Sequence, residues 1–365
     1  MAKGFTPNWF TVGMGTGILG LDAFLVPHAP RWLQQFGTGV WIFNLALVSL
    51  MLVLMLRRAL VDWPGFKDIL HHPQQSMFFG AIPMALTTVV NGFLDMGPVV
   101  LGPAAYHLAA WLWLVNAAMA LASVLVVPYY MFTRHDHALH SMTAVWLMPI
   151  VPAEVAAASG ALLLPHVANP ALAQALFIAS FSLWSFSVPL SFLLLGVLFL
   201  RLAVNNLPPA DMAISTWISL GTLGTGIMGL ILLGKDTPAV FPALGSEFFG
   251  VTLVAALVLW GFGLWWLIQS IALTIHYAVQ RNLPFNLGWW GLTFPLGVFT
   301  GGTDLLGKAL AVNFIDDAAV LFFVMLALFW VVVAVRTLRY LLGLRAARIR
   351  PQRGRSPLEV QASEG

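Results

Sequence analysis

The stretch Met14-Gly-Thr-Gly-Ile-Leu-Gly-Leu21 recurs almost unchanged as Leu223-Gly-Thr-Gly-Ile-Met-Gly-Leu230. Both copies lie in apolar segments interrupted by glycine or proline. Five such segments occur, one about every 70 residues, and each is followed by an unbroken apolar segment. A period this regular indicates one helical hairpin repeated five times. If each hairpin crosses a membrane twice, all five enter from the same side as parallel repeats around an axis along the membrane normal.

The composition requires a lipid environment. Of the 365 residues, 60% are hydrophobic and only 8% are charged, and the mean hydropathy is +0.88. Windows of about 20 apolar residues predict ten membrane-spanning helices. They cover residues 9–27, 39–58, 77–96, 104–128, 143–164, 172–201, 212–234, 247–277, 287–307 and 314–343. The predicted fold is an all-α integral membrane domain, residues 1–345, with five hairpins around a central pore. A basic cytoplasmic tail, residues 346–365, is expected to be disordered.

The positive charges predict the orientation. Only three of the 17 Lys and Arg residues, namely Arg31, Lys235 and Lys308, fall in the links from an odd segment to the next even one. The positive-inside rule therefore places both termini in the cytoplasm. The pI of about 9.4 reflects this bias of the loops and does not indicate nucleic acid. The chain contains no cysteine, which excludes disulfides and thiolate metal sites.

The odd segments hold most of the small residues, whereas the even segments are long and apolar. Small residues let helix backbones approach closely, as an inner ring requires. Tight packing without a lumen is the alternative, and recurrence in five repeats favours a lumen. The predicted breaks in the pore helices are at Gly15, Pro83, Pro149, Pro152, Gly224 and Pro295. Because a break frees backbone groups, we expect a passage lined by backbone dipoles and weakly electropositive.

Four acids lie in the odd segments. Asp22, Asp95 and Asp304 are near the outer ends, where water at the pore mouth could solvate them, and Asp304 is four residues from Lys308. Glu154 lies near mid-membrane without a basic residue in its own helix. Intramembrane acids are functional candidates. We therefore hypothesise that protonated Glu154, together with Asp22, permits anion passage and couples it to a proton.

Phe294 directly precedes Pro295, and the residues alone leave two interpretations open. An aromatic side chain at a kink can close a lumen by dewetting, or it can pack between helices. The cluster His135, His137 and His140 lies in a loop without a second cluster to complete a metal site. We predict no metal and no cofactor. The inner segments contain only scattered acids and no convergent nucleophile–base set, so we predict no enzyme. An integral-membrane enzyme stays as the alternative of a different class, and a non-transporting scaffold would not explain the matched helix breaks.

Four stretches carry a family resemblance: Pro7–Ile18, Phe79–Met84, Trp146–Pro152 with Ala156–Gly160, and Asn286–Gly297. They resemble the tellurite-resistance/dicarboxylate transporter family, which includes the slow anion channels, the malate permease and the sulfite efflux pumps. The resemblance implies ten helices in quasi-fivefold hairpin symmetry and an anion pore lined by the odd helices. It also implies a homotrimer with one pore in each protomer, and it assigns the plug of the pore to Phe294. Two residues depart from the family pattern. Thr222 stands where relatives often have proline, which weakens the prediction of a kink in the seventh helix. Glu154 is an acid in a stretch expected to be neutral, and either departure could alter selectivity or coupling.

These observations predict a transporter of small anions in the cell inner or plasma membrane. The leading substrates are sulfite and C4-dicarboxylates such as malate. Glu154 favours a proton-coupled carrier over a passive chloride- or nitrate-type channel, and a tellurite-resistance protein is a further alternative. The expected partners are small anions, the lipid bilayer and two further copies of the chain.

Overall fold

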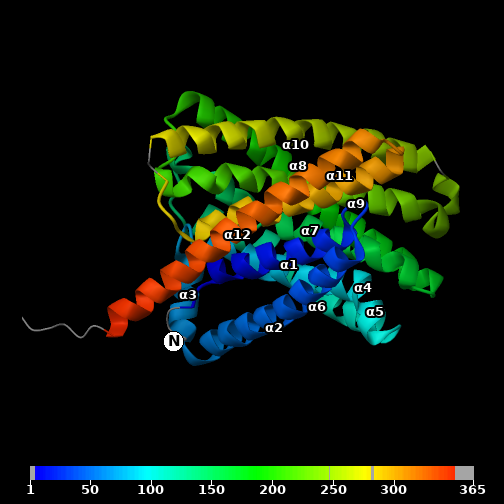
Figure 1. Cartoon of the computed structure of the whole chain (residues 1–365), viewed down its shortest axis with the longest axis horizontal. Coiled ribbons are helices and arrows are strands. Elements are labelled where there is room, and N and C mark those ends of the chain that lie inside the picture. Colours follow the sequence, from blue (N-terminus) through cyan, green and yellow to red (C-terminus); the bar gives the residue numbers. More distant parts are fainter. Residues whose placement is uncertain (1–4, 246, 281–282, 350–365) are drawn as a thin grey trace, which may run out of the picture.

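The ten apolar segments form helices that make up most of the fold. The computed structural model describes residues 5–245, 247–280 and 283–349, with side chains described up to residue 343 (Figure 1). Within these residues the regular secondary structure is helical and includes no strand. Seven of the helical segments are long and apolar enough to cross a membrane. The prediction of an all-helical fold is confirmed for the described residues, and seven of the ten predicted spans qualify as candidate membrane-crossing helices.

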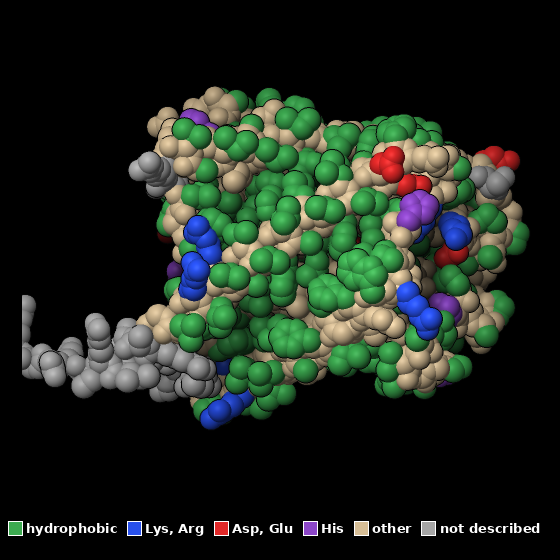
Figure 2. Space-filling model, viewed as in Figure 1, with side chains coloured by type: hydrophobic (Ala, Val, Ile, Leu, Met, Phe, Trp, Pro, Cys, Tyr) green, Lys and Arg blue, Asp and Glu red, His purple; other side chains and the backbone are tan. Residues whose placement is uncertain are grey.

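Five long helices, here called the outer helices, come from the even segments. They are α2 (Arg31–Val61), α6 (Ala104–Thr133), α8 (Pro170–Val204), α10 (Glu247–Val279) and α12 (Asn313–Ile349). In the most apolar window of each, only 28–33% of the residues are buried. Figure 2 shows hydrophobic side chains across the middle of one face, with charged side chains gathered toward its two ends. Such a broad apolar surface is typical of lipid-facing helices.

Five shorter helices, here called the inner helices, come from the odd segments. They are α1 (Phe10–Leu25), α4 (Ala81–Asp95), α7 (Val151–Leu163), α9 (Ser219–Val240) and α11 (Phe294–Leu310). Each follows a short 3-10 helix: η2 (Pro7–Trp9), η3 (Ser76–Gly80), η5 (Ala144–Leu147), η7 (Ala210–Ile218) and η9 (Leu287–Leu292). The apolar windows of Ser76–Asp95 and Ala210–Val240 are 83% and 89% buried. The inner helices therefore form the core.

Short elements connect the long helices: α3 (Trp63–His71), α5 (Gly97–Leu101), η4 (Leu139–Ser141), η6 (Leu164–His166) and η8 (Pro242–Leu244). Figure 1 shows α3 and the C-terminal end of α12 (red) at one end of the molecule and α5 at the other. Helix α12 continues to Ile349, past the predicted end of the domain at residue 345. The rest of the predicted tail, residues 350–365, lies outside the described residues.

The contacts among the inner helices form a closed cycle. Helix α1 contacts α4, α4 contacts α7, α7 contacts α9, α9 contacts α11, and α11 contacts α1 again. Each outer helix packs against two neighbouring members of this cycle, as α2 does against α1 and α4 and as α12 does against α11 and α1. The first and last repeats are thus neighbours in space, although they lie at opposite ends of the chain.

A tryptophan in every outer helix ties it to the inner helix of the next repeat. Each indole Nε1–H donates a hydrogen bond of 2.8–3.3 Å to a carbonyl or hydroxyl oxygen of that inner helix. The five pairs are Trp41 with Val89, Trp113 with Ala156, Trp184 with Gly226, Trp260 with Thr303, and Trp330 with Thr16. The last pair joins α12 to α1 and closes the cycle. Hydrogen bonds between helices are a main source of specific association in membranes, where helices gain little from burying apolar surface.

Two of the predicted helix breaks are wrong. Helices α1 and α9 run as continuous α-helices through Gly15 and Gly224. Glycine keeps its backbone N–H and can continue the helix, unlike proline. The prolines Pro83, Pro152 and Pro295 instead lie within the first three residues of α4, α7 and α11, where the missing N–H has no intrahelical acceptor to lose.

The backbone groups freed before α7 are satisfied by protein. Ser123 of α6 donates a hydrogen bond to the Pro149 carbonyl (3.0 Å), and Ser187 of α8 donates one to the Ile150 carbonyl (2.9 Å). These carbonyls therefore face outer helices. At these two carbonyls neighbouring helices meet the requirement for hydrogen bonding in lipid, so these two groups do not add dipoles to a central passage.

Candidate functional site

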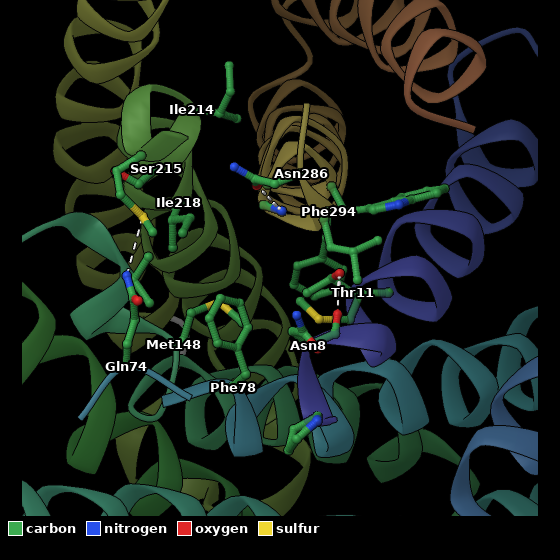
Figure 3. A pocket seen from close by; sticks show the side chains of 18 of the residues that line it. Asn8, Thr11, Gln74, Phe78, Met148, Ile214, Ser215, Ile218, Asn286 and Phe294 are labelled. Atoms are coloured by element: carbon green, nitrogen blue, oxygen red, sulfur yellow. Dashed lines mark hydrogen bonds between the residues drawn. The ribbon is translucent and has the colours of Figure 1, made fainter. Parts of the chain in front are cut away.

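A cavity of about 350 Å³, here called the N-end cavity, lies at the N-terminal ends of the inner helices. All five repeats contribute to it through the 3-10 helices or the residues beside them (Figure 3). Its polar lining includes Asn8, Gln74, Ser215 and Asn286, and its apolar lining includes Phe78, Met148, Ile218 and Phe294. The sequence alone did not single out these polar residues. Each lies shortly before an inner helix, so the 70-residue period was the signal that could have found them.

A second cavity of about 130 Å³, the C-end cavity, lies farther along the same helices. Its lining again includes residues of all five: Ile18 and Asp22 of α1, Thr88 and Asp95 of α4, Val155 of α7, Thr225 of α9, and Asp304 and Lys308 of α11. Both cavities are thus enclosed by the closed cycle of inner helices rather than by a single hairpin.

Phe294 lies between the two cavities. Among the described lining residues it is the one that belongs to both. Its side chain is 3% exposed, and it is the first residue of α11. An aromatic ring in this position places an apolar barrier between the two cavities, which is the geometry of a hydrophobic constriction.

Two glycines set the position of the helix that carries Phe294. A Cβ atom at Gly15 would lie 2.2 Å from Thr293 Oγ1, and one at Gly224 would lie 2.4 Å from the backbone nitrogen of Phe299. Thr293 itself donates to the Trp290 carbonyl (2.7 Å) and so holds the turn before α11. The absence of side chains at Gly15 and Gly224 therefore lets α11 wedge between α1 and α9.

The N-end cavity is polar but carries little charge. Asp211 is the one acid in its lining, and the lining contains no lysine, arginine or histidine among the described residues. Asn286 Nδ2 donates to the Asp211 backbone carbonyl (2.8 Å), and Gln74 Nε2 donates to the Met212 sulfur (3.6 Å). Amide groups can donate hydrogen bonds to an anion without a fixed positive charge, so this cavity can solvate an anion weakly.

The C-end cavity gathers three of the four acids predicted from the sequence. Asp22, Asp95 and Asp304 all line it, together with Lys308. Lys308 Nζ forms an ion pair with Asp304 Oδ2 at 2.7 Å. Asp22 lies against the glycine face of α11, because a Cβ at Gly297 would be 3.1 Å from Asp22 Oδ2. The side-chain charges of this cavity are mainly negative when ionised, which differs from the electropositive lining that we expected.

Glu154 lies apart from both cavities. It is fully buried on α7 and appears in neither lining, whereas its neighbour Val155 lines the C-end cavity. Thr222 and Thr225 of α9 lie beside the carboxyl group, but neither hydroxyl meets the geometry of a hydrogen bond to it. Thr225 instead donates to the Gly221 carbonyl (2.7 Å). The structure therefore does not bring Glu154 and Asp22 into one lining.

The histidine loop packs against aromatic and backbone groups. The His137 ring lies 4.9 Å from the Trp146 ring, and His135 Nε2 lies 2.9 Å from the Leu70 carbonyl oxygen. Burial lowers the pKa of His137. The described part of the chain contains no cluster of three or more His, Asp or Glu residues that could hold a metal ion.

The chain is similar to known membrane transport proteins over most of its length. A family model described as SLAC1, voltage-dependent anion channel, matches residues 4–338. The sulfite efflux pump of Trichophyton rubrum is 35% identical over 337 residues, which cover 90% of this chain and 88% of that protein. An uncharacterized transporter of Methanocaldococcus jannaschii is 30% identical, covering 92% and 93%. The malic acid transport protein of Schizosaccharomyces pombe is 24% identical, covering 84% and 71%.

Proposed function

The chain belongs to the SLAC1 family of voltage-dependent anion channels, and on that premise we propose that it carries small anions along a path through the N-end and C-end cavities. The observation that carries the proposal is the position of Phe294, which lines both cavities and separates them. An anion crossing between the cavities must pass this ring. Phe294 is therefore the proposed gate.

The proposed architecture is a quasi-fivefold ring of ten helices around that path. Two observations support it. The inner-helix contacts close on themselves from α11 to α1. The tryptophan hydrogen bonds repeat five times, and the last one joins the final helix to the first. Because both cavities receive residues from all five repeats, the axis of such a ring would run through them.

The proposed cellular setting rests on the distribution of charge and on the family resemblance. We place the chain in an inner or plasma membrane with both termini in the cytoplasm, because all but three of its Lys and Arg residues lie at that end. The N-end cavity then opens toward the cytoplasm and the C-end cavity toward the outside. Following the resemblance, we propose a homotrimer with one path in each protomer.

We propose sulfite as the first substrate and C4-dicarboxylates such as malate as the second. The sulfite efflux pump of Trichophyton rubrum is more similar to this chain than the malic acid transport protein is. The amide-rich lining of the N-end cavity suits either anion, since it offers donors without a fixed charge that would retain the ion.

Uptake into proteoliposomes tests the transport assignment. Sulfite, malate, chloride and nitrate would be offered one at a time to purified wild-type protein, with protein-free liposomes as the control. We expect sulfite to enter fastest. If none of the four anions crosses while the protein remains monodisperse and helical, the transport proposal fails, and an enzyme or a scaffold becomes the better interpretation.

Proton coupling is the proposed role of the buried acids, and the geometry favours Asp22 over Glu154. Asp22 lines the C-end cavity on the outer side of Phe294, and its Oδ2 has no hydrogen-bond partner among the described residues. The charged groups that face it are Asp304 and Lys308 of α11 and Asp95 of α4. An ionised Asp22 would repel an anion that has just passed the gate, whereas a protonated Asp22 would not.

A pH series with two amide variants distinguishes the two acids. Because protonation of Asp22 removes the repulsion, wild-type sulfite flux should fall as pH rises. In Asp22→Asn the side chain is always neutral, so flux at high pH should remain near its low-pH value. Glu154→Gln is the matched control and should keep the wild-type pH dependence. The total external sulfite and bisulfite must be corrected for their own titration. A wild-type pH profile in Asp22→Asn and a flat one in Glu154→Gln would transfer the role to Glu154.

A further inference from the structure

From the charges of the C-end cavity we propose that Lys308 is an anion-binding residue at the outer end of the path. Its ion pair with Asp304 lowers its affinity for the anion. This inference rests on the proposed transport function and adds a specificity-determining site to it. The ligand class is a small oxyanion or carboxylate, for which a lysine ammonium is a suitable donor.

Lys308 is distinguished by its charge. Among the described residues that line either cavity, it is the one cation. Lys235 is the lysine at the corresponding C-terminal end of α9 in the preceding repeat. Lys235 is exposed and does not belong to either lining. An anion that has passed Phe294 therefore meets positive charge at Lys308 and not at Lys235.

The hydrogen bonds of the ammonium group leave capacity for a ligand. Lys308 Nζ donates to Asp304 Oδ2 at 2.7 Å and approaches the Leu25 carbonyl at 3.4 Å. An ammonium has three donors, so one remains. The Lys308 side chain is 52% exposed, whereas that of Asp304 is 7% exposed. Asp304 therefore holds the lysine from the protein side, while about half of the Lys308 side chain stays accessible and contributes to the lining of the C-end cavity.

The pairing with Asp304 explains how such a site could serve transport. A lysine without a partner would hold an anion too strongly, and conduction requires that the ion also leave. The Asp304 carboxylate offsets much of the positive charge at Lys308. Removal of the lysine should weaken the external anion site, and removal of the charge on Asp304 should strengthen it. These opposite effects separate a binding role from a purely structural ion pair.

The experiment measures inhibition by external sulfite. Right-side-out membrane vesicles would be loaded with labelled sulfite, and efflux would be followed while unlabelled sulfite is added outside. We expect Lys308→Met to raise the half-inhibiting concentration about fivefold, the size expected for one partly exposed charge. Asp304→Asn should lower it by a similar factor. Lys308→Arg should stay close to wild type, because the charge is kept, and Lys235→Met should not change it.

The double variant Lys308→Met/Asp304→Asn keeps the test valid if the single lysine variant folds poorly, because it does not leave the Asp304 carboxylate without its ion-pair partner. It should behave like Lys308→Met. If efflux is intact and the half-inhibiting concentration is the same in wild type, in the double variant and in Asp304→Asn, the assignment of Lys308 is overturned and the transport proposal stands. If wild-type vesicles release no sulfite, the transport proposal itself fails, and the assignment of Lys308 fails with it.

Discussion

Replacement of Phe294 by alanine should raise sulfite flux about tenfold, which corresponds to a barrier lowered by about 1.4 kcal/mol. The ring lies between two cavities that are otherwise separate, and it is almost fully buried. Its removal would join the two spaces and let water wet the constriction, which lowers the barrier to a hydrated anion. Flux into proteoliposomes at matched protein content is the measurement.

Phe299 provides the control for this substitution. It lies on the same helix, five residues further on, and is fully buried, but it lines neither cavity. Its ring packs against Phe322 of α12 with a centroid distance of 5.6 Å. Phe299→Ala removes the same atoms and should lower stability without raising flux. An equal rise in flux in both variants would mean that the flux increases because the protein is less tightly packed, and not because a gate at Phe294 has opened.

The gate should retain its function when another large apolar side chain replaces phenylalanine. Phe294→Leu keeps most of the volume and all of the apolar character, so its flux should lie much nearer to wild type than that of Phe294→Ala. If Phe294→Ala remains as closed as wild type in protein that transports sulfite, the constriction must lie elsewhere in the path.

Substitution of Gly224 by alanine should destabilise the core strongly. The added Cβ would lie 2.4 Å from the Phe299 nitrogen and 2.5 Å from the Val298 carbonyl carbon. Both atoms belong to the backbone of α11 and cannot rotate away, so α9 and α11 would have to separate. We expect a loss of about 2–3 kcal/mol, at the upper end of the range for overpacked cores. Thermal unfolding in detergent, followed by circular dichroism, measures it.

Gly221 is a matched control one turn earlier on the same helix. A Cβ there would have its nearest neighbour, Pro295 Cβ, at 3.7 Å, which is an ordinary contact. Because alanine is also a better helix former than glycine, Gly221→Ala should be neutral or slightly stabilising, by about 0.5–1 kcal/mol at most. Equal destabilisation of the two variants would contradict the close packing of α9 on α11.

In Gly224→Ala the position of Phe294 should shift together with the loss of stability. Helix α11 carries Phe294 at its first residue and is held between Gly15 of α1 and Gly224 of α9. A displacement of α11 at Gly224 should therefore also change flux through the residual folded protein. This coupling follows from the geometry, because the helix that forms the packing contact is the helix that carries the ring.

Several features of the fold could be predicted from the sequence because they depend on local composition and on period. Long apolar runs predict helices in lipid, and each of the ten predicted spans overlaps one α-helix, although five of them also overlap the 3-10 helix that precedes it. The prediction of breaks at Gly15 and Gly224 was wrong because it relied on the low intrinsic helix propensity of glycine. Its lack of a side chain is used here for close packing, which depends on a partner helix that sequence order does not reveal.

The tertiary structure alone decided which polar groups meet. Asp22, Asp95 and Lys308 are far apart in the chain, and only the packing of α1 against both α4 and α11 brings them into one cavity. It also decided that Glu154 does not line the C-end cavity. Neighbouring residues of a helix point in different directions, so Val155 of α7 faces the cavity and Glu154 does not. The sequence by itself therefore determined the helices and their repeat, since both arise from short-range pattern. The site was decided by which helix faces turn inward, and that depends on packing between segments distant in sequence.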